Sequence, residues 1–251
     1  MPSSSTPATA STPAADEVQH ALRVVVFAMA TLAEQRESDT ESHILRVQGY
    51  VRVLAKQLST HPAFAAMLTP ATIDTLCHSV PLYDMGSVGV PDRILLKPGR
   101  LTADEVNIMR THTTAGYEAL MRAEKTMGRP SPLLDLAKEL ILSHQEKWDG
   151  SGYPQRLAGT QIPASARILA LADVYDALIT NKVYKDGVPH TKAVQIILSE
   201  RGAHFDPDVV DAFLVVETEF HTIAQRFAET DADMQRRMEY MANAIAENAE
   251  L

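Results

Sequence analysis

Apolar residues that recur every three or four positions are the feature of this 251-residue chain that most limits its fold. Such spacing places a stripe of apolar side chains along each helix, whereas signals for β-strands are scarce. The pattern predicts an all-α protein with core helices at about 44–58, 70–79, 102–124, 132–145, 164–180, 191–200 and 207–220. Thr40 or Asp39 is available to start the first of these helices, and Asp206-Pro207 is a favourable cap and first turn for the last.

Two more helices are predicted to flank this core, one at 17–37 and a charged, Ala- and Met-rich one at 228–251. The N-terminal helix has an apolar stripe that consists of Val18, Leu22, Val25, Met29 and Leu32. The stripe fits packing on its own domain and equally fits a homodimer seam, because it is too short to identify a coiled coil. Residues 1–16 are rich in Ser, Thr, Pro and Ala and predict a disordered tail, which leaves the main domain at 38–227.

Composition limits the cellular compartment and the classes of binding partner that we expect. The 23 basic and 32 acidic side chains give a formal charge of −9, so we expect no binding of duplex nucleic acid. Cys77 is the only cysteine, which excludes an internal disulfide and fits a reducing compartment. The longest apolar run, at 24–33, is roughly half of what a membrane-spanning helix requires, and residues 1–15 lack the features of a signal peptide. We therefore expect a cytoplasmic protein that does not enter the membrane.

Five residues able to bind a metal lie on, or at the ends of, different predicted helices: His43, Asp84, His112, His144 and Asp173. Imidazole nitrogens and carboxylate oxygens are the ligands expected for Fe, Mn, Zn or Ni, and helical bundles build such sites from inward-facing side chains. Because the chain has nine histidines, spacing alone does not separate a metal site from ordinary buried or surface histidines.

The most specific motif is Trp-Asp-Gly-Ser-Gly-Tyr-Pro at 148–154, which directly follows His144-Gln145-Glu146. Related motifs lie at 88–99, 111–116, 172–178 and 204–207. Together they resemble the HD-GYP family of cyclic di-GMP phosphodiesterases, most of all the output domains of response regulators, over residues 25–227. The resemblance implies an HD-superfamily helical bundle with an HD-GYP extension, preceded by a linking helix.

The resemblance also implies a set of metal ligands, namely Asp39, His43, Asp84, His112, His144 and Asp173. The family's glutamate falls on Asp39, which keeps a carboxylate one turn before His43 but shortens its reach. The His-Asp dyad falls on Tyr83-Asp84, and a phenol with a pKa of about 10 is a poor ligand at neutral pH. Asp84, the surviving member of the dyad, is the expected catalytic residue.

Two more family residues are replaced. A lysine that offsets charge on the phosphate falls on Ser87, and the second member of a His-His pair falls on Gln145. Asp84, His112 and His144 would still form a three-ligand site, so the implied cofactor is a divalent transition metal such as Fe or Mn, with one ion or none bound.

The ligand-binding parts match the family more closely. Lys182 and Lys185 fall in the family's phosphate-contacting segment, although plain solvated charge is the alternative. The loop Gly152-Tyr153-Pro154 shapes the ligand pocket in the family and docks GGDEF-type proteins; alternatively, Tyr153 only packs its ring in a turn. Asp149 and Asp176 are predicted to cap and orient helices rather than bind metal.

The sequence is compatible with three functions. The first is a degenerate module that binds cyclic di-GMP or a signalling protein with weak or no hydrolysis. The family's reaction uses two metals roughly 3.5–4 Å apart, and the replaced ligands would leave one ion or none. The second is an active phosphodiesterase that releases pGpG or GMP. The third is a phosphohydrolase of another nucleotide, since helical HD domains serve many substrates.

Overall fold

The computed structural model describes residues 13–35, 41–97, 99–181 and 187–228, together with Gln235, Met238 and Glu239. Over these residues the protein is all-α, as predicted, and strand-like pairing is limited to one bridge between Arg201 and Phe205. The helices are α1 (Pro13–Gln35), α2 (Glu41–Leu58), α3 (Pro70–Ser79), α4 (Asp92–Leu95), α5 (Ala103–Met127), α6 (Pro132–Ser143), α7 (Ala164–Ile179), α8 (His190–Ser199) and α9 (Pro207–Arg226). Three short 3-10 segments accompany them: η1 (Val80–Leu82), η2 (Met85–Gly89) and η3 (Gly159–Gln161).

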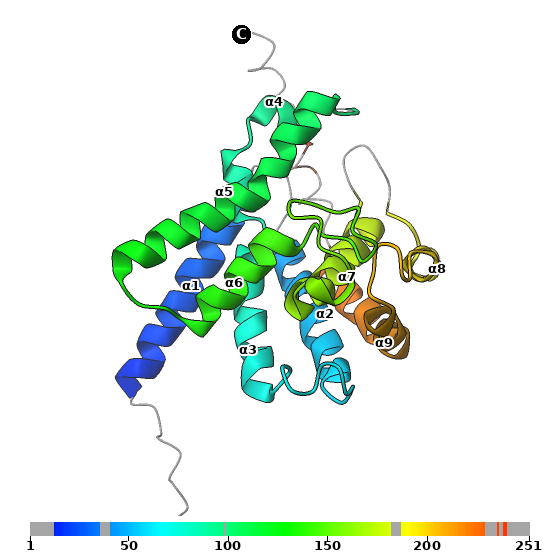
Figure 1. The fold of residues 1–251 in the computed structure, drawn as a ribbon, viewed down its shortest axis with the longest axis horizontal. Coiled ribbons are helices and arrows are strands. Elements are labelled where there is room, and N and C mark those ends of the chain that lie inside the picture. Colours follow the sequence, from blue (N-terminus) through cyan, green and yellow to red (C-terminus); the bar gives the residue numbers. More distant parts are fainter. Residues whose placement is uncertain are drawn as a thin grey trace, which may run out of the picture.

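Helix α2 runs through the middle of the domain, with α5 and α6 on one side and α7 to α9 on the other (Figure 1). Its buried face carries Val51 and Leu54 at helical spacing. On the same face, Tyr50 stacks on Phe220 of α9 with ring centroids 4.6 Å apart and meets Tyr175 of α7 edge to face at 5.2 Å. These aromatic contacts join α2, α7 and α9 around one apolar core.

Helix α6 connects α5 to this core, because it packs against α3, α5 and α7. Residues of η1 and α6 form a second apolar cluster around Leu82, Ala137 and Ile141. Val26 of α1 packs on the same cluster. The N-terminal helix is therefore attached to the side of the domain that also carries η1 and η2.

Local signals explain most of the helix ends. Thr102 and Glu105 form a capping box at the start of α5, and Gly128, at φ 74°, ends that helix. Asp206 caps α9 through the backbone N–H of Asp208, with Pro207 in the first turn, as predicted. Helix α9 continues to Arg226, six residues past its predicted end, because Phe220 and Ile223 extend its apolar face onto the core.

Helix α1 begins at Pro13, four residues before the predicted start, since proline suits a first helical turn. Ala30 and Ala33 are buried against the domain, whereas the predicted stripe faces outward: Val18, Leu22, Val25, Met29 and Leu32 are 53% to 64% exposed. Residues 1–12 of the predicted tail lie outside the described residues, as does most of the predicted helix at 228–251. None of the described helices combines the length and the apolar character needed to cross a membrane.

Candidate metal centre

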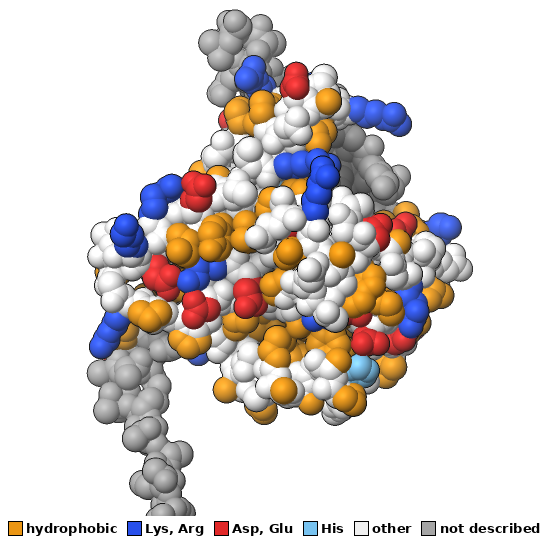
Figure 2. Space-filling model, in the orientation of Figure 1, with side chains coloured by type: hydrophobic (Ala, Val, Ile, Leu, Met, Phe, Trp, Pro, Cys, Tyr) orange, Lys and Arg blue, Asp and Glu red, His pale blue; other side chains and the backbone are white. Residues whose placement is uncertain are grey.

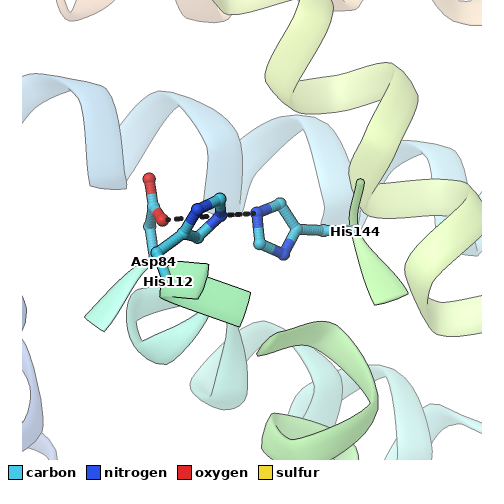
Figure 3. Close-up of side chains that lie close together, drawn as sticks. All are labelled: Asp84, His112 and His144. Atoms are coloured by element: carbon cyan, nitrogen blue, oxygen red, sulfur yellow. Dashed lines mark hydrogen bonds and ion pairs between the residues drawn. The ribbon is translucent and has the colours of Figure 1, made fainter. Parts of the chain in front are cut away.

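Asp84, His112 and His144 converge from three separate elements (Figure 3). Asp84 stands just before η2, His112 lies within α5, and His144 caps the end of α6. One ligand atom from each side chain lies within 4.8 Å of the other two. Both histidines are buried and Asp84 is partly exposed, so the cluster is closed on the core side and open on the side of Asp84.

The orientation of the two histidines fits a bound cation. His112 Nδ1 lies 2.7 Å from the carbonyl of Met109, and His144 Nδ1 lies 3.0 Å from that of Leu140, so each Nδ1–H donates to the backbone. The two Nε2 atoms then face one another at 3.3 Å, and in a neutral ring with Nδ1–H the Nε2 atom carries a lone pair that can bind a metal. Burial lowers the pKa of His144, which keeps that ring neutral. Two imidazole nitrogens and a carboxylate around one point are a suitable ligand set for Fe, Mn or Zn.

Two glycines bring Asp84 close to His112. A Cβ on Gly86 of η2 would lie 1.9 Å from the carbonyl oxygen of His112, and a Cβ on Gly116 would lie 3.2 Å from the backbone of Gly86. Only glycine at position 86 allows η2 to lie directly on α5. This backbone contact sets the distance of 3.5 Å between Asp84 Oδ1 and His112 Nε2.

His43 and Asp173 are held by Tyr83 instead of joining this cluster. The Tyr83 hydroxyl donates to Asp173 Oδ1 at 2.8 Å and lies 2.8 Å from His43 Nε2. The Tyr83 side chain is 4% exposed, and its ring packs edge to face on His144, with centroids 5.2 Å apart. Burial raises the pKa of Asp173, which the hydrogen bond from Tyr83 partly offsets. The phenol of Tyr83 thus lies between two side chains that the sequence predicted to be metal ligands.

Asp176 holds the His43 ring from the side opposite Tyr83. Its Oδ2 accepts from His43 Nδ1 at 2.8 Å, and the guanidinium of Arg46 donates to both of its oxygens. Burial would raise the pKa of Asp176, but the hydrogen bonds from Arg46 and His43 hold it well below the usual range. Asp149, in contrast, accepts from the backbone N–H of Ser151 and shapes a turn.

The Gly152-Tyr153-Pro154 loop is anchored next to the cluster. The buried carboxylate of Glu146 accepts from the backbone N–H groups of Gln155 and Leu157. A Cβ on Gly152 would lie 2.3 Å from the backbone nitrogen of Lys147, so this position requires glycine. The Tyr153-Pro154 peptide bond is cis. The loop is therefore a fixed part of the site wall.

Tyr153 lies at the rim of the cluster. Its ring meets His112 edge to face at 6.2 Å, and the guanidinium of Arg110 lies over it, 4.9 Å from the centroid. Burial and the charge of Asp84 raise the pKa of the Tyr153 phenol to about 12. The ring is thus a neutral, partly exposed surface beside the three ligands.

The remaining predicted residues divide into two groups. Ser87 is buried in η2, and Gln145 follows His144, where its carbonyl accepts from the Tyr153 N–H. Asp39, Lys182 and Lys185 lie outside the described residues. Sequence reasoning missed Arg110 and the anchoring role of Glu146, although both stand beside predicted ligands in the chain.

The fold and the site define a class. The family model described as HD domain matches residues 28–209, and the chain therefore belongs to the HD domain family. It is 53% identical over 210 residues to a "Probable cyclic di-GMP phosphodiesterase" of Vibrio cholerae, covering 84% of this chain and 48% of the relative. It is 49% identical over 214 residues to a "Cyclic di-GMP phosphodiesterase" of the same organism, covering 85% and 43%. These relatives confirm the resemblance to HD-GYP phosphodiesterases.

A solved structure agrees on the fold. A cyclic GMP-AMP specific phosphodiesterase of V. cholerae superposes with a TM-score of 0.57 at 20% identity, over 86% of this chain and 53% of that chain. The chain spans less than half the length of the two curated relatives.

Proposed function

We propose that this chain is an HD-GYP module of cyclic di-GMP signalling that binds the dinucleotide with at most one metal ion and hydrolyses it weakly or not at all. The observation that carries the proposal is the Tyr83 hydroxyl, which occupies both His43 Nε2 and Asp173 Oδ1. The ligand class rests on the curated relatives, both of which bear the name cyclic di-GMP phosphodiesterase.

The three-ligand cluster is proposed as the single metal position. A divalent ion held by Asp84, His112 and His144 would neutralise one phosphate oxygen. Tyr153 would line the pocket next to that phosphate, and its high pKa keeps it a neutral hydrogen-bond donor. Gly152 and Pro154 would fix the shape of this wall, while Lys182 and Lys185 would contact phosphate from the segment between Asn181 and Gly187.

Loss of turnover follows from two features. Hydrolysis by paired metals needs two ions roughly 3.5–4 Å apart. The two atoms that would bind the second ion, His43 Nε2 and Asp173 Oδ1, are instead hydrogen-bonded to the Tyr83 hydroxyl. Ser87 also supplies no positive charge for the phosphate, and loss of one charge-stabilising donor typically costs about a hundredfold in rate.

The test compares the unmodified protein with a variant that carries Tyr83→His, Ser87→Lys and Gln145→His. Each is loaded separately with iron or manganese and incubated with cyclic di-GMP, and the products are separated by chromatography. We expect intact dinucleotide with the unmodified protein and pGpG or GMP with the variant. Rapid hydrolysis by the unmodified protein would establish an active phosphodiesterase instead.

Metal analysis gives an independent check. We expect no more than one equivalent of transition metal per chain in the unmodified protein and more in the restored variant. Two equivalents in the unmodified protein contradict the proposal.

Separate titrations test which nucleotide the protein binds. The unmodified protein is titrated with cyclic di-GMP, with 3′3′-cGAMP and with GMP, and we expect the tightest binding for cyclic di-GMP. Tight binding of another nucleotide without binding of cyclic di-GMP would indicate a phosphohydrolase fold adapted to a different ligand.

The proposed partners follow from surfaces of the chain. We propose a GGDEF-type protein as the partner of the Gly152-Tyr153-Pro154 loop and a second copy of this chain as the partner of α1, in the cytoplasm. The spacing of Val18, Leu22, Val25, Met29 and Leu32 alternates four and three, as in a two-stranded coiled coil. On the face shown in Figure 2, Lys and Arg side chains mostly stand apart, so this face offers no continuous basic patch to duplex nucleic acid.

A further inference from the structure

Arg110 lies next to the metal cluster on the same helix as His112. Positions i and i+2 point to different faces of a helix, yet both side chains contact the ring of Tyr153. The long Arg110 side chain therefore reaches back along α5 towards the Gly152-Tyr153-Pro154 loop. Its guanidinium lies 4.9 Å from the centroid of the Tyr153 ring.

The charge of Arg110 is not neutralised by a carboxylate in the described part of the chain. Other basic side chains do have acidic partners. Arg122 on the same helix pairs with Glu118, Lys138 pairs with Glu124, and Arg46 pairs with the buried Asp176. Arg110 is exposed, so its guanidinium can offer several donors to a ligand beside Tyr153.

Among the described residues around the cluster, Arg110 can supply positive charge to a bound dinucleotide, in addition to the charge that Lys182 and Lys185 are proposed to supply. A cyclic dinucleotide carries two phosphodiester groups, each with a single negative charge. One divalent metal at Asp84, His112 and His144 leaves one positive charge after Asp84 is counted, so the cluster by itself balances only one of the two phosphates. Ser87, which stands where the family has a lysine, contributes no charge, and Arg46 is already paired.

We infer that Arg110 binds a phosphate of the cyclic dinucleotide, with its guanidinium held in place by the face of Tyr153. This inference rests on the proposed function and adds a ligand-binding residue to it. The flat guanidinium suits the role because it can donate two parallel hydrogen bonds to phosphate oxygens while it stacks on an aromatic ring.

The test uses the metal-loaded full chain and calorimetric titration with cyclic di-GMP. Arg110→Met keeps an unbranched chain over Tyr153 without the charge, Arg110→Lys keeps the charge without the fork, and Arg110→Ala removes both. Arg122→Ala is the matched control on the same helix. Metal content is measured on every sample.

We expect Arg110→Met and Arg110→Ala to weaken binding roughly 10- to 100-fold, Arg110→Lys to weaken it less, and Arg122→Ala to have no effect. Higher salt should weaken binding by the unmodified protein more than by Arg110→Met.

Each other outcome overturns the inference in a recognisable way. If Arg110→Met binds as tightly as the unmodified protein, the charge is irrelevant, and any loss in Arg110→Ala reflects packing on Tyr153. If Arg110→Met loses its metal, the residue supports the metal cluster instead. If the unmodified protein itself does not bind cyclic di-GMP, the proposed function fails together with this inference, whereas binding that is equal in all variants removes this inference alone.

Discussion

The hydroxyl of Tyr83 satisfies two polar atoms in the interior, His43 Nε2 and Asp173 Oδ1. In Tyr83→Phe both atoms lose this partner, and an unsatisfied buried polar group costs about 1–3 kcal/mol. We expect the free energy of unfolding, measured with urea, to fall by that amount. Tyr153→Phe is the control, because no hydrogen bond involves the Tyr153 hydroxyl in the described structure; equal stability of Tyr83→Phe and the unmodified protein would contradict the expectation.

His204 predicts a dependence of stability on pH. Burial, with a smaller effect of Lys147, lowers its pKa to about 4, whereas an unfolded histidine titrates at about 6.5. Between these values the unfolded chain binds a proton that the folded chain does not. The contribution of His204 is therefore complete above pH 6.5 and is lost as the pH falls towards 4.

Urea titrations at several pH values test this. The slope of unfolding free energy against pH between 6.5 and 4 should be smaller in His204→Gln than in the unmodified protein. His20→Gln, at an exposed position of α1, should leave the slope unchanged. If the slope in His204→Gln equals that of the unmodified protein, the imidazole of His204 titrates alike in the folded and the unfolded chain.

At the scale of single residues, the sequence predicted the cluster but not its surroundings. Asp84, His112 and His144 could be nominated because motif positions identify ligands. The link from Tyr83 to His43 and Asp173 could not be foreseen, since the direction of a side chain at a helix end is not set by spacing. Arg110 was missed for a related reason: its contact with Tyr153 joins positions 43 residues apart in a chain whose loop path was unknown.

The packing of η2 on α5 is the element contact on which the metal cluster depends. In Gly86→Ala the new methyl group would lie 1.9 Å from the carbonyl oxygen of His112, so η2 must move away and carry Asp84 with it. We expect metal affinity to fall by about tenfold or more, and overpacking to cost about 1–3 kcal/mol of stability. Titration with Mn²⁺ and urea unfolding measure the two effects.

Gly89→Ala is the matched control within η2, because a Cβ at Gly89 has no heavy atom within 4 Å. It should bind metal as the unmodified protein does. If both variants bind equally well, the contact between η2 and α5 does not position Asp84.

The core helices were largely predictable, because most of them bury a stripe of apolar residues and many ends carry caps. Departures occur where tertiary contacts decide. Helix α6 stops at Ser143, two residues early, and His144 then turns its ring into the cluster. The 3-10 segments η1 and η2 were not foreseen, because short tight turns have no apolar period of their own.

For the molecule as a whole, the outward stripe of α1 predicts self-association. Leu22→Glu places a charge within the stripe and should shift the protein to monomers in sedimentation experiments. Val24→Glu is a matched control, since Val24 is 54% exposed but lies off the stripe. A monomeric unmodified protein, or equal behaviour of the two variants, would contradict pairing through this face.

Three hydrogen bonds run in line from Asp176 through His43 and Tyr83 to Asp173. Each needs its own hydrogen, and a neutral imidazole and a phenol supply one apiece. Because the Tyr83 hydroxyl donates to Asp173, the hydrogen between His43 and Tyr83 is an additional proton on the second ring nitrogen of His43. With it comes a unit of positive charge between His43 and Asp173, so a proton provides there the charge that the family resemblance assigns to a metal ion.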